Sequence, residues 1–191
     1  MRQLTLFLYS SLDGYAEGPN GAMDIVFVAY NEELEQFANK VLSTADTVLC
    51  GRQTYEVMYG YWPDMINNPE ASEHEQNHAN WIHNVQKVIC STTLQSADWH
   101  NSTLLKDDII TKINELKQQD GEDIVILGSP RLAHYLMAHK LIDSIKLTLS
   151  PSVIGSGLQV FKNFSQSLKL MSSKTFSTGA LGLHYVVINK A

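Results

Sequence analysis

The chain has 191 residues, of which 44% are hydrophobic and 18% are charged, and its formal net charge is −6. A chain of this length can bury enough apolar surface for one sizeable core, so we expect a single domain over residues 1–191. The acidic balance, without a block of Lys or Arg, argues against nucleic acid and membrane as partners. The apolar runs are too short to span a bilayer and the N-terminus lacks a signal-peptide pattern, which together predict a cytoplasmic protein.

Strand-like and helix-like runs alternate over the first three-quarters of the chain, and two strands follow. Apolar side chains three or four residues apart indicate the helices, and short β-rich runs indicate the strands. Asn31 and Ser129 are expected N-caps, and Pro130 suits the first position of a helix. The expected elements are a strand at 3–10, a helix at 31–42, a strand at 47–50, a short helix from 51, a strand at 87–91, a helix at 107–116, a strand at 123–127, a helix from 130, and strands at 142–149, 168–176 and 183–189.

This order predicts an α/β fold with a mostly parallel central sheet, flanking helices and an antiparallel C-terminal hairpin. The hairpin turn is expected near Gly179. The segment 64–80 is polar, has no apolar period and is expected to be a surface insertion. Cys50 and Cys90 each end an apolar strand-like run, so we expect both to be buried and unpaired.

Three strand ends carry residues suited to phosphate binding. Gly51-Arg52, Ser91-Thr92 and Gly128-Ser129 each follow a buried strand, where the ligand crevice of a parallel sheet lies. Glycine allows close backbone approach, a helix N-terminus favours anions, and arginine offers a forked cation. Together they predict a dinucleotide cradle, with the pyrophosphate at Ser129 and an adenosine phosphate near Arg52. The alternative is that each is an ordinary strand-to-helix turn.

Residues 74–78, His-Glu-Gln-Asn-His, match the H-E-x-x-H pattern of zinc hydrolases. On a helix, the two histidines would face one way and Glu75 could act as a general base. The surrounding segment is polar and no compelling third ligand follows. A chance match is therefore the favoured interpretation, and we expect no metal site.

Carboxylates and aromatic side chains near the proposed crevice are candidates for the chemistry and for ligand stacking. A buried carboxylate can deliver a proton beside a hydride donor, and Glu33 flanks the buried face of its helix. The other nearby acids are Asp13, Asp24 and Glu35. Four aromatic residues fit either stacking on a planar heterocycle or closing an edge of the core, namely Tyr55, Tyr59, Tyr61 and Trp62.

Six motifs occur in the order seen in a known family. They are Ser-Ser-Leu-Asp-Gly-Tyr at 10–15, Gly-Arg-Gln-Thr-Tyr-Glu at 51–56, Tyr-Trp-Pro at 61–63, Ser-Thr-Thr-Leu at 91–94, Ile-Leu-Gly-Ser at 126–129, and Pro151 followed by Gly-Ser-Gly at 155–157 and Phe161. With them the chain resembles the dihydrofolate-reductase-like fold. More narrowly, it is similar to a stand-alone version of the reductase domain at the C-terminus of bifunctional riboflavin-biosynthesis deaminase/reductases. The resemblance extends from residue 1 to about residue 188.

The resemblance implies NADPH as the hydride donor and assigns residues by position. Those matched to cofactor binding are Gly51, Arg52, Thr54, Tyr55, Ser91, Thr92, Gly128, Ser129, Pro130 and Leu132. Ser91 and Thr92 match the loop beside the 2′-phosphate, which favours NADP over NAD. The segment 11–21 resembles the mobile loop that closes over nicotinamide. The catalytic candidates are Glu33, which matches the active-site carboxylate, Thr148, which supports it, and Asp13 in the Gly-rich loop.

The chain also departs from the family pattern. Ser129 stands where many relatives have a second glycine, and Ile25 stands where a tryptophan is usual. The deaminase zinc motif of the bifunctional protein is absent, so only the reduction is expected. Few cations beyond Arg52 and Arg131 are available for a ribosyl phosphate.

The sequence therefore predicts an NADPH-dependent reductase of a small planar nitrogen heterocycle. The first substrate class is that of 5-amino-6-(5-phosphoribosylamino)uracil reductases, and the second is dihydrofolate or another pterin. An alternative of another class is an NADP-binding module without turnover, and the zinc hydrolase is a third. Because members of the family usually pair, we expect a homodimer.

Overall fold

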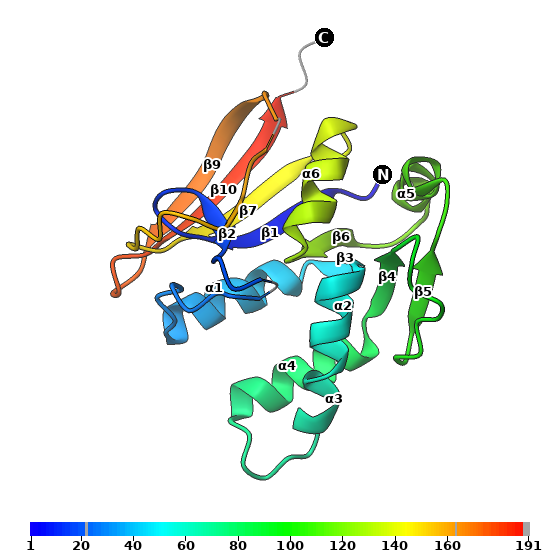
Figure 1. Ribbon diagram of the computed structural model, residues 1–191, viewed down its shortest axis with the longest axis horizontal. Helices are drawn as coiled ribbons and strands as arrows, with labels where there is room; N and C mark the ends of the chain where they lie inside the picture. The colour runs from blue at the N-terminus through cyan, green and yellow to red at the C-terminus, as the bar shows by residue number, and fades with distance from the viewer. Residues whose placement is uncertain (22, 163, 189–191) are drawn as a thin grey trace.

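An eight-stranded sheet runs through the centre of the computed structural model, which describes residues 1–21, 23–162 and 164–188 (Figure 1). Its strands are β1 (Leu4–Ser10), β3 (Ala45–Gly51), β4 (Gln86–Cys90), β5 (Ser102–Leu105), β6 (Asp123–Leu127), β7 (Ser144–Leu149), β9 (Ser167–Thr175) and β10 (Leu181–Ile188). Their order across the sheet is β5-β4-β3-β6-β1-β7-β10-β9. The first six in this order pair in parallel, whereas β10 runs antiparallel to both β7 and β9.

This arrangement confirms the predicted α/β fold with a mostly parallel sheet and an antiparallel C-terminal strand pair. Parallel neighbours need a crossover between them, which is why helices separate most strands in the first three-quarters of the chain. The last two strands need only a turn, and Gly179 supplies it with a positive φ of 83°. The predicted end of the final strand, Asn189, lies outside the described residues.

Helices cover both faces of the sheet. They are α1 (Glu32–Leu42), α2 (Arg52–Tyr59), α3 (Trp62–Met65), α4 (Glu73–Asn84), α5 (Ile109–Gln118) and α6 (Pro130–Ala138). The buried side chains of α5 and α6 belong to one hydrophobic cluster, and those of α1, α2 and α4 belong to a second cluster. Asn31 caps α1 as predicted, because its side-chain oxygen accepts a hydrogen bond of 3.0 Å from the backbone N–H of Leu34.

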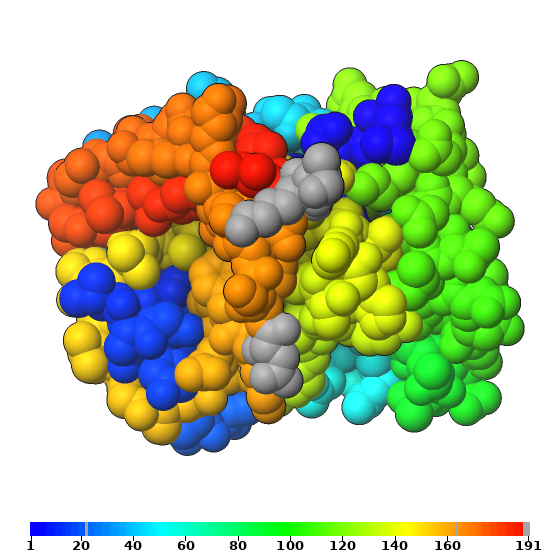
Figure 2. Space-filling view, turned by 90° about the horizontal axis from the view of Figure 1, so that it is seen from above, coloured from blue at the N-terminus to red at the C-terminus, as the bar shows by residue number. Residues whose placement is uncertain are grey.

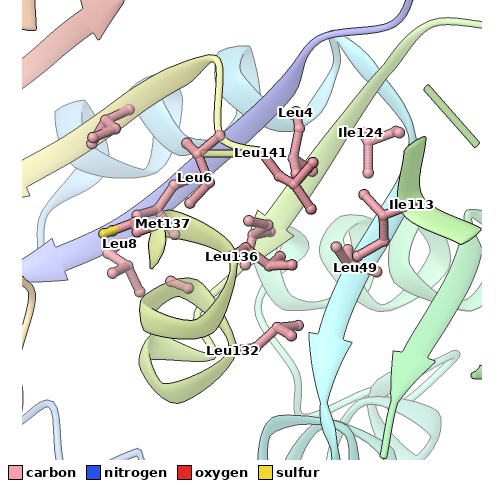
Figure 3. Packing of buried hydrophobic residues seen from close by; sticks show 14 of the residues in the cluster. Leu4, Leu6, Leu8, Leu49, Ile113, Ile124, Leu132, Leu136, Met137 and Leu141 are labelled. Carbon is pink, nitrogen blue, oxygen red and sulfur yellow. The ribbon is translucent and has the colours of Figure 1, made fainter. Parts of the chain in front are cut away.

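Strand β1 separates the two clusters because its side chains alternate between the faces of the sheet. Leu4, Leu6 and Leu8 point into the cluster under α5 and α6 (Figure 3), while Phe7 packs into the other. Cys50 and Cys90 are buried and unpaired, as predicted. No helix in the described part of the chain combines the length and apolar character needed to cross a bilayer.

The segment 64–80, predicted to be a surface insertion, contains the start of a helix. Its C-terminal part begins α4, which Ser72 and Glu75 start with a reciprocal capping box. Only Ala79 and Ile82 of this helix are buried, so its sequence shows hardly any apolar period. The helix instead gains stability at its ends, which a search for apolar periodicity does not detect.

The C-terminal end of α4 is fixed by a buried lysine. The Lys87 ammonium donates to the carbonyl oxygens of Ile82, His83 and Val85 at 2.8 to 2.9 Å. It also lies 4.7 Å from the ring centroid of Trp99. A cation bonded to the last carbonyls of a helix stabilises that end, so Lys87 anchors the inserted helix to the sheet.

Three short strands were not predicted. Besides β5 at the sheet edge, β2 (Tyr15–Glu17) and β8 (Leu158–Gln159) form a separate antiparallel pair. This pair joins the N-terminal Gly-rich loop to the segment after β7, and Figure 2 shows the blue and yellow-orange residues of these two segments side by side. Their pairing is non-local, so short-range patterns carry little signal for it.

Candidate functional site

Two adjoining hollows lie at the carboxyl ends of the central strands. One is an open groove over the ends of β3, β4 and β6, and the other is a cavity of about 250 Å³ between the sheet, α1, α2 and α4. The two hollows share four lining residues, which we call the junction: Glu17, Thr54, Ser129 and Pro130. A ligand that occupies both hollows must pass this junction.

The groove collects most of the residues that the sequence assigned to the cofactor. Its lining includes Gly51, Arg52, Thr54, Ser91, Thr92, Ser129, Pro130 and Leu132. Gly128 lines the cavity next to them. Because these residues come from three separate strand ends, their convergence is a property of the fold and not of local sequence.

Tyr55 is the exception, since it does not line either hollow. It is buried, and its hydroxyl accepts a hydrogen bond of 3.1 Å from the backbone N–H of Trp99. Its ring stacks on Tyr59, which in turn stacks on Trp99. Of the four aromatic residues considered for ligand stacking, Trp62 alone lines the cavity. Tyr55 and Tyr59 therefore pack as the core-edge interpretation requires.

Ser129 ties the end of β6 to the end of β3 and the start of α2. Its hydroxyl accepts from the Gly51 N–H at 3.0 Å and donates to the Thr54 hydroxyl at 2.7 Å. Ser129 precedes α6 as predicted, but its side chain makes no capping hydrogen bond, because the hydroxyl is already engaged across the groove. Gly128 and Ser129 both have positive φ, 59° and 57°, so the backbone turns sharply between β6 and α6.

Two arginines border the groove. Arg52 pairs with Glu56 one helical turn later at 2.9 Å, and Arg131 reaches Gln53 at 3.1 Å and Glu17 at 3.4 Å. Both guanidinium groups are largely exposed. The Arg52–Glu56 pair is exposed and such pairs are weak, so Arg52 can turn to a phosphate at little cost.

The cavity is apolar apart from a few titratable side chains. Its apolar lining includes Phe7, Leu8, Ala16, Met23, Ile25, Ala38, Leu42, Met58, Trp62 and Leu127. The titratable residues are Tyr9, Glu17, Tyr30, His74 and His78. Burial, with smaller contributions from neighbouring groups, raises the pKa of Tyr9 and raises that of Tyr30 to about 12, so both phenols keep their protons at neutral pH.

The three predicted catalytic residues do not line this cavity. Glu33 accepts a hydrogen bond of 2.6 Å from the Ser177 N–H, and the pKa of its carboxyl is lowered, chiefly by hydrogen bonds from Ser177. Asp13 accepts from Ser11, Ile154 and Gly155 and thereby ties the Gly-rich loop to the segment after β7. Thr148 is buried in β7, and its hydroxyl has no hydrogen-bond partner among the described residues.

The His-Glu-x-x-His motif lies on α4 with both histidines turned toward the cavity. His74 Nε2 lies 2.9 Å from the Tyr30 hydroxyl, and His74 Nδ1 lies 3.5 Å from a Glu35 carboxylate oxygen. Glu75 is occupied by the capping box and by a hydrogen bond of 2.8 Å from Tyr61. In the described part of the chain no three His, Cys, Asp or Glu side chains are placed to hold a metal ion.

His78 makes folding sensitive to acid. Burial, with a smaller effect of His74, lowers the pKa of His78 to about 4, whereas an unfolded histidine titrates near 6.5. The unfolded chain thus binds more protons between these values, and stability falls as the pH drops from 7 to 5 by about 2 kcal/mol from this residue alone. Urea titrations at both pH values should show that His78→Gln loses this part of the pH dependence. His139→Gln, which changes an exposed histidine, is the control and should retain it. An equal change in the free energy of unfolding between pH 7 and pH 5 for all three proteins would contradict this role of His78.

Sequence reasoning missed the cavity wall formed by Glu17, Tyr30, His74 and His78. The His-Glu-x-x-His match did draw attention to α4, but as a metal motif. The i, i+4 spacing of its histidines carries the useful signal, because it places both side chains on one helix face.

The sheet is mostly parallel, ends in an antiparallel strand pair and carries a polar groove at its strand ends. These features are those of a dihydrofolate-reductase-like α/β protein. Comparison with known proteins gives the family directly. The model of the RibD C-terminal domain matches residues 2–181, and the chain belongs to this family.

The chain is also similar to individual proteins. The uncharacterised protein YyaP of Bacillus subtilis (strain 168) is 28% identical over 186 residues, which cover 96% of this chain and 94% of YyaP. A crystal structure from Shewanella sp. PV-4, described as that of a riboflavin biosynthesis protein, superposes with a TM-score of 0.75 at 17% identity, covering 98% of this chain and 99% of that one. Dihydrofolate reductase from Enterococcus faecalis, complexed with NADP(H), gives 0.62 at 12% identity, covering 98% and 97%. These structures share the fold.

Proposed function

We propose that the protein is an NADPH-dependent reductase of a small planar nitrogen heterocycle. The observation that carries this proposal is the continuity of the two hollows through the junction. A polar groove built from three strand ends suits the phosphates of a dinucleotide, and an apolar cavity beyond the junction suits planar rings.

The residues of the groove fit such a cofactor. Gly51 leaves space at its Cα, since an added Cβ would have its nearest neighbour, Leu132, 3.8 Å away. Gly128 and Ser129 bring the backbone to the N-terminus of α6, which favours the pyrophosphate. Arg52, with the Ser91 and Thr92 loop, would hold the adenosine phosphates.

Bound NADPH would supply a hydride to a carbon of a C=N bond, and the nitrogen of that bond must then take up one proton. Tyr30 is the cavity residue we assign to this proton, because its hydroxyl is connected through His74 to Glu35. Glu33 and Thr148 are proposed to support α1 and β7 beside the cavity, and Asp13 to position the Gly-rich loop.

The family favours an aminouracil substrate, since the fold is shared with a deaminase/5-amino-6-(5-phosphoribosylamino)uracil reductase from Thermotoga maritima. One observation favours the second class, an unphosphorylated ring such as a pterin. Among the described residues, no Lys or Arg lines the cavity, so a ribosyl phosphate would have to reach Arg52 or Arg131 in the groove.

A homodimer is also proposed. The edge strand β9 exposes Leu170 and Met171 at about half of their surface, and an exposed strand edge with apolar side chains is suited to pairing with a second copy.

Arg52→Ala is expected to weaken NADPH binding about tenfold, equivalent to about 1.4 kcal/mol, and to change NADH binding much less. The physical reason is loss of the cation that we propose faces the 2′-phosphate, a group that NADH lacks. Fluorescence titration of the purified protein with both cofactors measures this difference.

Lys140→Ala provides the matched control, because it removes an exposed positive charge beyond the C-terminal end of α6, away from the groove. It should leave both affinities unchanged. Failure of the unaltered protein to bind either cofactor would refute the proposed reductase function.

A further inference from the structure

Glu17 is a buried carboxylate at the junction of the two hollows. It is the last residue of β2, it is 5% exposed, and it lines both the groove and the cavity. Of the residues that line the cavity in the described part of the chain, it alone carries a carboxylate. Acidic residues are seldom buried without a partner, so this position calls for an explanation.

The partners of Glu17 within the chain are few and distant. One carboxylate oxygen lies 3.4 Å from the backbone nitrogen of Met23, and the other lies 3.4 Å from Arg131 Nη1. The same Arg131 nitrogen is 3.1 Å from Gln53, and its side chain is mostly exposed. An ionised carboxylate can accept about four hydrogen bonds, so Glu17 retains capacity for a positively charged or donating group of a ligand.

We propose that Glu17 directs its negative charge at the nicotinamide ring and stabilises the oxidised cofactor relative to the reduced one. The inference rests on the proposed function, because a dinucleotide with its pyrophosphate at Ser129 would extend through the junction and carry its nicotinamide ring into the cavity beside Glu17. It concerns a residue that the sequence did not single out.

The charge balance of the reaction gives the reason. Hydride donation by bound NADPH would break a C–H bond of the dihydronicotinamide and use its two electrons for the new C–H bond of the acceptor, which would leave the nicotinamide ring as a cation. A fixed carboxylate in an apolar site interacts with that cation far more strongly than in water. The phosphates are the same in both redox forms, so Glu17 would change the ratio of the two affinities, whereas residues that contact only the phosphates would change both affinities together.

The test compares dissociation constants for NADP⁺ and NADPH by calorimetric titration of the purified protein. Glu17→Gln retains the size of the side chain and removes its charge. The ratio of the two constants is expected to shift about tenfold in favour of NADPH. Glu56→Gln is the matched control, because Glu56 is exposed and pairs with Arg52 at the groove, so its removal should shift both constants equally.

Arg131→Ala changes a mostly exposed side chain and should shift the ratio in the opposite direction. Removing the cation nearest to Glu17 leaves the carboxylate less compensated, so the ratio should shift toward NADP⁺. An unchanged ratio in Glu17→Gln would overturn the role of Glu17. If Glu17→Gln does not fold, an unchanged ratio in Arg131→Ala would do the same. In either case, binding of NADPH by the unaltered protein would still support the proposed reductase function. Absence of binding by the unaltered protein would overturn both.

Discussion

Gly157→Ala is expected to lower the free energy of unfolding by about 3 kcal/mol, because it combines backbone strain with a steric clash. Gly157 has a φ of 135°, which L-residues rarely adopt, and an added Cβ would overlap the carbonyl oxygen of Glu17. Relief of the overlap requires β2 and β8 to move apart. The substitution should therefore also weaken NADPH binding, since Glu17 lies at the junction.

The matched control for this prediction is Gly155→Ala, two residues earlier in the same loop. Gly155 also has a positive φ, 73°, but an added Cβ would have no atom within 4 Å. It should cost about 1 kcal/mol from strain alone and leave cofactor binding intact. Urea denaturation followed by circular dichroism measures both variants, and equal losses of stability would show that the contact with Glu17 is unimportant.

Gly128→Val is expected to weaken NADPH binding at least thirtyfold, or about 2 kcal/mol. Gly128 has a φ of 59°, and its added Cβ would lie 3.5 Å from the Thr54 methyl group, beside the junction. A branched side chain there would shift the Gly128-Ser129 turn and disturb the hydroxyl that connects Gly51 to Thr54. Close approach of phosphates to this turn would be lost.

Gly179→Val separates backbone strain from the effect on the groove. Gly179 has a comparable φ of 83° but lies in the turn between β9 and β10, where its nearest prospective contact is Pro151 at 3.8 Å. The two valine variants should lose similar stability, and only Gly128→Val should lose affinity in the fluorescence titration. Normal binding by Gly128→Val would remove this turn from the proposed cofactor site.

Predictions that depend on local patterns were confirmed by the structure. The alternation in residues 4–9 placed leucines and aromatic residues on opposite faces of β1, and Asn31 marked the start of α1. Each of these signals depends on residues a few positions apart. The order of strands and helices then favoured a mostly parallel sheet, because few connections between such elements are possible.

The site predictions also succeeded where they depended on nearby residues and were incomplete where they depended on distant ones. Glycines and hydroxyl residues at strand ends lie together because parallel strands end at one edge of the sheet, so most of the groove could be anticipated. Glu33 was matched by position to a catalytic carboxylate, but its direction depends on Ser177, which is 144 residues away in the sequence. The cavity wall depends on α4, whose anchor is the buried Lys87 and not an apolar stripe.

The sequence by itself determined the fold class, the alternation of elements, and the chemical character of the three strand ends, because local conformation and apolar periodicity depend on neighbouring residues. Only the tertiary structure decided which side chains share the cavity. It brought Glu17 from the N-terminal loop, His74 from α4 and Ser129 from the start of α6 to one place. Contacts of this kind depend on how elements distant in sequence pack together, and the spacing of residues along the chain does not reveal them.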